Sequence, residues 1–137
     1  IQGPNLNLTG EREKGVYGSE TYAEICQQIN ECAESVGLVC EIFQSNHEGA
    51  IIDKLHEARL NCDGIIINAG AYTHYSYAIR DAIAAIKIPC IEVHMSNIYG
   101  REDFRSKSVI APVCAGHIAG FGKHGYFLAI HGLVEML

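Results

Sequence analysis

Glu92 and His94 stand two residues apart at the end of the segment Cys90–Val93, whose apolar composition predicts a strand. Alternate side chains of a strand leave the same face, with Cα atoms about 6–7 Å apart at this spacing. A carboxylate at that distance can hold one imidazole nitrogen and leave the other as a proton donor. The pair therefore indicates a general acid, although a polar pair at the surface end of a strand would show the same spacing.

A candidate base lies between Thr9 and Gly18, in a polar stretch that is long for a strand-to-helix connection and typical of an active-site lid. This stretch contains Arg12 and Tyr17. A tyrosine has a reference pKa near 10, so it acts as a base at neutral pH only where a cation lowers that value. Arg12 is the candidate cation. An exposed loop tyrosine beside an unrelated arginine explains these two residues more simply when they are taken alone.

Neutral polar side chains follow the apolar segments at several points of the sequence. Asn5, Asn68 and Ser96 can donate or accept hydrogen bonds to hydroxyl groups or to an enolate oxygen without adding a charge. His74 also follows an apolar segment, and we expect it to contact a ligand.

Arg101 and Arg105 are four residues apart in a stretch that predicts a short helix over 101–106, so they would share one helix face. Two guanidinium groups on one face could bind an anionic or polyhydroxyl ligand. Ordinary surface charge is equally compatible with their spacing.

Elements that could bring these residues together are visible as short apolar segments alternating with amphipathic ones. The predicted strands are a first strand ahead of Gly3, then Leu38–Phe43, Gly64–Ile67, Cys90–Val93 and Pro112–Ala119. The predicted helices are one that begins after a Thr21–Glu24 capping box and ends before Gly37, then Gly49–Leu60, Ser76–Ile86 and Tyr126–Leu137. Because Ile1 leads almost directly into a loop, we expect the first strand to lack its beginning.

This alternation predicts an α/β fold of flavodoxin-like type, a doubly wound five-stranded parallel sheet in a three-layer α/β/α arrangement. Ligands of such folds bind outside the carboxyl ends of the strands, which is where the polar candidates lie. The 137 residues form one predicted domain, 1–137.

Composition excludes several classes of function. A net charge of −6 argues against nucleic acid or an anionic membrane as partner, and no apolar run approaches the roughly 20 residues that span a bilayer. The six cysteines are dispersed without C-x-x-C pairs and apart from the histidines, which indicates reduced thiols in a cytoplasmic protein and no zinc site. Gly120–Gly125 spells G-x-G-x-x-G, but it follows the last strand and predicts a tight turn.

Separated strings of the chain together resemble type II 3-dehydroquinase, a 3-dehydroquinate dehydratase. The strings that carry this resemblance are Gly3–Leu8, Arg12-Glu13, Tyr17-Gly18, Gln44–Gly49, Ala71–His74, Ile79–Asp81, Ile91–His94, Arg101-Glu102 and Phe104-Arg105. The resemblance runs over nearly the whole chain, and so many matches in one order are far more specific than any single one.

The resemblance implies a hydro-lyase that converts 3-dehydroquinate to 3-dehydroshikimate by anti elimination through an enolate, without metal or cofactor. It implies catalytic roles for Tyr17 as base, Arg12 as its cation, Asn5 as holder of a water, and His94 as acid oriented by Glu92. The substrate-binding residues that it implies are Asn68, His74, Asp81, Met95, Ser96 and Arg105. Asp81 would act from a neighbouring subunit of a dodecamer of four trimers.

Some positions depart from the family's usual pattern. Gln2 precedes Gly3 where the family usually has asparagine, which puts local support of Asn5 in doubt, and Lys14-Gly15 replaces a stretch that commonly contains proline.

The dehydration that the resemblance implies serves both aromatic biosynthesis in the shikimate pathway and quinate breakdown. The alternatives are a flavodoxin-like flavin- or nucleotide-binding module without catalysis and a receiver domain. The first would need a phosphate-cradling first loop and the second clustered acids, and neither is seen.

Overall fold

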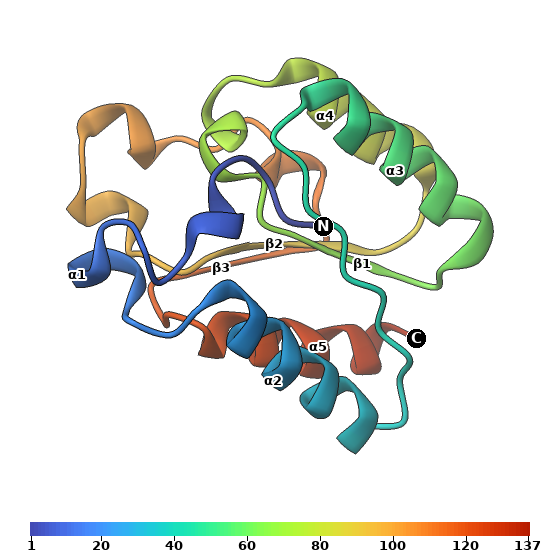
Figure 1. The fold of residues 1–137 in the computed structure, drawn as a ribbon. Coiled ribbons are helices and arrows are strands. Elements are labelled where there is room, and N and C mark those ends of the chain that lie inside the picture. The colour runs from blue at the N-terminus through green and yellow to red at the C-terminus, as the bar shows by residue number, and fades with distance from the viewer.

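A parallel sheet lies at the centre of the computed structural model, which describes residues 1–137, and helices cover both of its faces (Figure 1). The sheet contains β1 (Ile65–Ile67), β2 (Cys90–His94) and β3 (Gly116–Ala119) in the order β1-β2-β3, with both pairs parallel. β1 is made entirely of isoleucine and β2 is buried throughout, as expected for strands covered on both faces.

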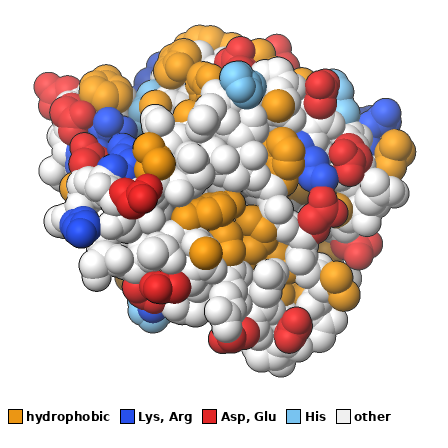
Figure 2. Space-filling model, in the orientation of Figure 1, with side chains coloured by type: hydrophobic (Ala, Val, Ile, Leu, Met, Phe, Trp, Pro, Cys, Tyr) orange, Lys and Arg blue, Asp and Glu red, His pale blue; other side chains and the backbone are white.

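Two more extended segments flank this sheet, but neither forms a regular strand. Gln2 makes single parallel bridges to Gln44 on one side and to Asn68 on the other. The resulting order of segments across the molecule matches a flavodoxin-like sheet, so the predicted fold class is confirmed. The prediction of a strand over Leu38–Phe43 is wrong, because this segment forms no continuous ladder of hydrogen bonds with a neighbouring strand. Only the two residues at the N-terminus lie between it and β1. A cavity of about 520 Å³ lined largely by apolar side chains lies there instead, and Figure 2 shows hydrophobic side chains near the middle of this face.

The helices form two layers (Figure 1). α3 (Glu48–Asn61) and α4 (Tyr77–Ile86) cover one face, while α2 (Tyr22–Ser35) and α5 (His124–Met136) cover the other. The predicted capping box of α2 is present, with reciprocal hydrogen bonds between Thr21 and Glu24. None of these helices has the length and apolar composition to cross a membrane.

Strand alternation divides the apolar core into two clusters. Ile65, Ile67 and Cys90 pack with α3 and α4, whereas Ile91 and Val93 pack with α2 and α5. Glu92 and His94 therefore point to the α3–α4 side of β2, where polar loops replace the helices at the carboxyl edge.

Short elements in the loops around the sheet carry three of the candidate residues, Tyr17, His74 and Arg105. These elements are α1 (Lys14–Tyr17) and the 3₁₀ turns η1 (Leu6–Leu8), η2 (Gly70–His74), η3 (Ile98–Gly100), η4 (Asp103–Ser106) and η5 (Ala111–Val113). Two predictions are corrected here. The last strand begins at Gly116 because η5 occupies the start of the predicted range. Of the predicted helix over 101–106 only Asp103–Ser106 is helical, as the 3₁₀ turn η4, and Arg101 lies before it.

Candidate active site

A polar pocket of about 110 Å³ opens at the carboxyl ends of the strands. Its walls include Tyr17 and His94 together with Arg12, Asn5, Asn68, His74, Met95, Ser96 and Arg105. The structure thus brings together all the site residues predicted from sequence except Glu92 and Asp81. Figure 2 shows basic side chains gathered on the side of the molecule where α1 lies, and the pocket itself contains three arginines. An anionic ligand suits such a pocket.

Glu92 lies directly behind His94 and is completely buried. His94 Nε2 and Glu92 Oε2 form a hydrogen bond, as the strand spacing predicted. The other ring nitrogen, Nδ1, has no hydrogen-bond partner within the chain, and the ring is part of the pocket wall. A carboxylate that fixes one nitrogen of an imidazole leaves the other free for proton transfer.

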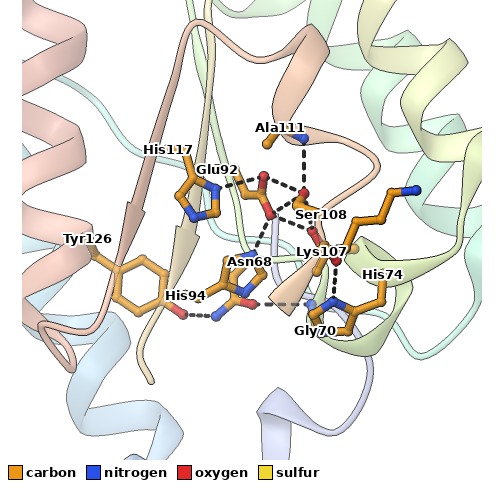
Figure 3. A network of polar contacts seen from close by, with 11 residues as sticks. Asn68, Gly70, His74, Glu92, His94, Lys107, Ser108, Ala111, His117 and Tyr126 are labelled. Atoms are coloured by element: carbon orange, nitrogen blue, oxygen red, sulfur yellow. Dashed lines mark hydrogen bonds and ion pairs between the residues drawn. The ribbon is translucent and has the colours of Figure 1, made fainter. Parts of the chain in front are cut away.

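The Glu92 carboxylate accepts hydrogen bonds on both oxygens (Figure 3). Oε1 accepts from Ser108 Oγ at 2.8 Å and lies 3.0 Å from His117 Nδ1, while Oε2 accepts from Thr73 Oγ1. Burial alone would raise the pKa of Glu92. The hydrogen bonds from His117, His94 and Thr73, with the charge of His94, outweigh it and hold the pKa far below its usual range. Glu92 is therefore a buried anion at neutral pH.

The ligand atoms of Glu92, His94 and His117 lie within 4.8 Å of one another, a spacing that could hold a metal ion. Each of the two imidazole rings already forms one hydrogen bond with the carboxylate, and two hydroxyl groups occupy further lone pairs. A metal would have to displace these bonds, so the donor set fits a hydrogen-bonded network better than a metal site.

Tyr17, at the end of α1, lies between two arginines. Arg101 donates a hydrogen bond from Nη1 to the Tyr17 hydroxyl oxygen at 2.8 Å, and its Cζ lies 5.3 Å from the ring centroid. Arg12 Cζ lies 4.8 Å from the same centroid. Glu13 bonds to both guanidinium groups and so links them. The predicted Arg12–Tyr17 contact is present, but the group on the phenol oxygen is Arg101.

Asn68 is held by a chain of buried hydrogen bonds at the end of β1 (Figure 3). Its Nδ2 donates to Tyr126 Oη at 2.8 Å, and that hydroxyl donates to Gln2 Oε1 at 2.9 Å. The Asn68 Oδ1 accepts from the Gly70 backbone N–H at 3.1 Å. Burial raises the pKa of Tyr126 to about 12, so Tyr126 remains a neutral donor here. Gln2 thus supports Asn68 rather than Asn5.

Asn5 belongs to the loop that follows the N-terminal extended segment, and this loop packs closely on the loop that follows β1. It has a left-handed φ of 68°, and its backbone N–H donates to Asn46 Oδ1 at 3.0 Å. A Cβ on Gly3 would lie 2.4 Å from the Ala69 backbone, so only glycine allows this approach. The Asn5 side chain is thereby directed to the pocket wall without a hydrogen bond of its own.

His74 lies beside His94, with ring centroids 6.4 Å apart in a stacked arrangement. Its Nδ1 lies 2.8 Å from the Lys107 carbonyl oxygen, so Nδ1 carries the proton and Nε2 is an acceptor. Partial burial lowers the pKa of His74, and the nearby His94 and Arg105 add to this effect, although the bond to Lys107 opposes it. A neutral histidine results, which suits it to bind a hydroxyl group.

Ser96 and Arg105 complete the wall of the pocket. Ser96 Oγ accepts a hydrogen bond from Arg101 at 3.3 Å, and the Ser96 backbone N–H has no partner within the chain. Arg105 is fixed by a bond from its Nε to Glu102 at 3.0 Å. Asp81, by contrast, is exposed on α4 and is not part of the pocket.

Several residues of the site did not stand out in the sequence. Thr73, Ser108 and His117 converge on Glu92, and Tyr126 bonds to Asn68, but each lies in an apolar or turn segment without a distinctive spacing. Arg101 carried a signal only as a possible anion-binding residue. Its contact with Tyr17 joins residues 84 positions apart, which no local pattern reveals.

A doubly wound α/β fold, with a tyrosine and a histidine in one pocket at the strand ends, defines an enzyme of the acid–base class. The chain belongs to the class II dehydroquinase family, because residues 1–134 match the family described as Dehydroquinase class II.

Known proteins similar to the chain agree with this assignment. A 3-dehydroquinate dehydratase of Caldicellulosiruptor bescii is 59% identical over 100% of this chain and 95% of that protein. The crystal structure of type II dehydroquinase from Butyrivibrio crossotus is 57% identical, with a TM-score of 0.96 over 98% of this chain and 94% of that one. The type II dehydroquinase of Propionibacterium acnes gives a TM-score of 0.94 at 39% identity, covering 98% and 92% of the two chains.

Proposed function

We propose that this chain is a 3-dehydroquinate dehydratase, a hydro-lyase that converts 3-dehydroquinate to 3-dehydroshikimate by anti elimination through an enolate. One observation carries the proposal: a single pocket contains two proton carriers, each fixed by its own partner. Arg101 bonds to the oxygen of Tyr17, and Glu92 bonds to His94. An elimination of water needs both, since one proton must leave carbon and another must reach the departing hydroxyl.

Tyr17 acts as the base and takes the proton from C2 of the substrate. The guanidinium group of Arg101 donates to the phenol oxygen, and Arg12 lies over the ring, so both cations stabilise a tyrosinate. The electron pair of the broken C2–H bond moves toward the C3 carbonyl and forms an enolate. Asn5, with no side-chain partner inside the chain, holds a water that donates to the enolate oxygen.

His94 acts as the acid in the second half of the reaction. The enolate collapses to form the C1–C2 double bond, the C1–O bond breaks, and His94 Nδ1 delivers its proton so that the hydroxyl leaves as water. Glu92 stabilises the imidazolium that donates this proton. Asn68 lies beside His94 in the pocket and binds the departing group.

The remaining pocket residues bind parts of the substrate that do not react. The substrate carboxylate accepts from the backbone N–H groups of Met95 and Ser96 and from the Ser96 hydroxyl. His74, through its acceptor nitrogen, and Arg105 bind the ring hydroxyls. Binding at several points fixes the ring so that C2 faces the base and C1–O faces the acid.

Addition of 3-dehydroquinate to the folded protein tests this proposal, because the product is a conjugated enone and absorbs in the ultraviolet. We expect the absorbance to rise in proportion to protein concentration, without added metal and in the presence of a chelator. A flat trace from protein with a native circular dichroism spectrum would contradict it.

The two arginines around Tyr17 give a prediction about pH. We expect Arg101→Ala and Arg12→Ala each to move the acidic limb of the kcat/KM profile to higher pH, because Tyr17 then ionises with less help from a cation. Arg101→Ala should cause the larger shift, since Arg101 bonds to the oxygen itself. Steady-state kinetics across pH measure this, with Arg59→Ala on α3 as a control. Unshifted profiles in both variants would exclude the cationic role.

Assembly and location form the last part of the proposal. We infer a cytoplasmic dodecamer of four trimers in which Asp81 of one subunit helps to bind substrate in another; its exposure on α4, outside its own pocket, supports this. Asp81→Ala should then raise KM several-fold with little change in kcat, as removal of a substrate-binding contact does. Light scattering gives the assembly size, and a monomer with full activity and a low KM would contradict the inference.

A further inference from the structure

His117 lies next to Glu92 in the strand register, on β3, and its imidazole reaches the same carboxylate from the side opposite Ser108 (Figure 3). Its Nδ1 lies 3.0 Å from Glu92 Oε1, and its ring lies 5.6 Å from the His94 ring, measured between centroids. His117 did not stand out in the sequence. The structure instead gives Glu92 two imidazole partners, one on each oxygen.

The two oxygens of Glu92 divide their partners between them. Oε1 faces His117, Oε2 faces His94 and Thr73, and Ser108 lies within hydrogen-bond distance of both. A carboxylate held on both oxygens cannot rotate to follow one partner. His117 therefore contributes to the orientation that Glu92 imposes on His94.

The single negative charge of Glu92 cannot balance positive charges on both His94 and His117. The titratable groups that face His117 are Glu92 and His94, both from β2; Thr73 and Ser108 do not ionise at neutral pH, and His74 and Arg105 lie beyond His94. One carboxylate can neutralise one imidazolium. When His117 is protonated, it pairs with the Glu92 carboxylate, and its positive charge repels a second imidazolium at His94.

The direction of the effect follows from the contacts of His117. The hydrogen bond to Glu92 raises the pKa of His117, although partial burial opposes this, so its cation persists to higher pH than that of a free histidine. The His117 side chain is 26% exposed, so solvent screens part of the interaction.

We propose that His117 is a positioning residue that holds Glu92 for His94 and, in its cationic form, competes with His94 for the Glu92 charge. The inference rests on the proposed function, in which His94 must carry a proton to act as the acid. In its cationic form His117 takes part of the Glu92 charge that otherwise stabilises the proton on His94.

Two replacements separate the two effects. His117→Asn keeps a neutral donor near the position of Nδ1 but cannot ionise, and His117→Val removes the donor as well. We expect His117→Asn to keep kcat at its optimum within about threefold and to move the basic limb of the kcat profile to higher pH by roughly half a unit to one unit. We expect His117→Val to show the same shift and a further three- to tenfold loss of kcat. KM should change little in either variant, because His117 is not part of the pocket.

His131→Asn, on the exposed side of α5, is the matched control, and its profile should superimpose on that of the wild type. A basic limb that does not move in His117→Asn, with active wild-type enzyme, would overturn the proposal. A wild type without dehydratase activity would instead overturn the proposed function, and the contact can then still be tested by NMR. The titration midpoint of His117 should lie above 6.5, the ordinary value for histidine, and should fall back to that value in Glu92→Gln. The same His117 midpoint in the wild type and in Glu92→Gln would show that the two groups do not share a charge.

Discussion

Tyr17→Phe should lower kcat by roughly 10²- to 10⁴-fold, the range that a positioned base contributes. Phenylalanine keeps the ring that lies between Arg12 and Arg101 but lacks the oxygen that accepts the proton. We therefore expect the pocket shape and substrate affinity to be retained. Steady-state kinetics measure the loss, and calorimetry can use 3-dehydroquinate itself because the variant turns it over too slowly to consume it.

Tyr75→Phe is the matched control for this replacement. Tyr75 is 59% exposed and lies outside the pocket, so its variant should keep wild-type kinetics. Substantial turnover by Tyr17→Phe would show that another group removes the proton. A parallel loss of substrate binding would show that the hydroxyl acts in binding and not as a base.

Glu92→Gln should lower kcat by roughly 100-fold or more and change KM much less. The amide retains the size of the side chain, but it removes the buried charge that stabilises protonated His94. It also places an N–H group where hydroxyl and imidazole donors converge, so at least one of them loses its acceptor. Glu135→Gln, near the exposed end of α5, serves as the control.

The acid stability of the same variant gives a second readout. The folded-state pKa of Glu92 lies below its ordinary value of 4.5, so its charge stabilises the fold above about pH 4.5, and this stabilisation is lost as the pH falls below that value. Urea unfolding at several pH values should show a steeper loss of unfolding free energy with acid in the wild type than in Glu92→Gln. Equal slopes would mean that Glu92 titrates alike in the folded and unfolded chains.

Sequence patterns predicted the parts of the fold that depend on interactions within a single helix. The capping box at Thr21 and the periodicity of α2, α3, α4 and α5 follow from the residues within each helix. The segment Leu38–Phe43 has the composition of a strand, yet it forms no ladder, because a strand depends on its neighbours as well as on its own residues. The separate turns η3 and η4 were missed for a similar reason, since the loop is shaped by the pocket that it covers.

The candidate site was predictable where spacing along one strand decides geometry. Glu92 and His94 are the clearest case, because two residues of separation determine a shared face. The Arg101–Tyr17 bond and the His117–Glu92 bond depend on tertiary packing and strand register, so neither appears in any window of sequence. Tyr17 itself was an ordinary loop tyrosine until the family resemblance singled it out.

The stereochemical course at C2 tests the central claim most directly, namely that the enzyme removes water from 3-dehydroquinate by anti elimination. The substrate is 3-dehydroquinate carrying deuterium in one of the two C2 positions, and mass spectrometry follows the label in the product. Deuterium on the face opposite the departing hydroxyl should be lost to solvent, and deuterium on the same face should be retained. Retention of the first label and loss of the second would contradict the account.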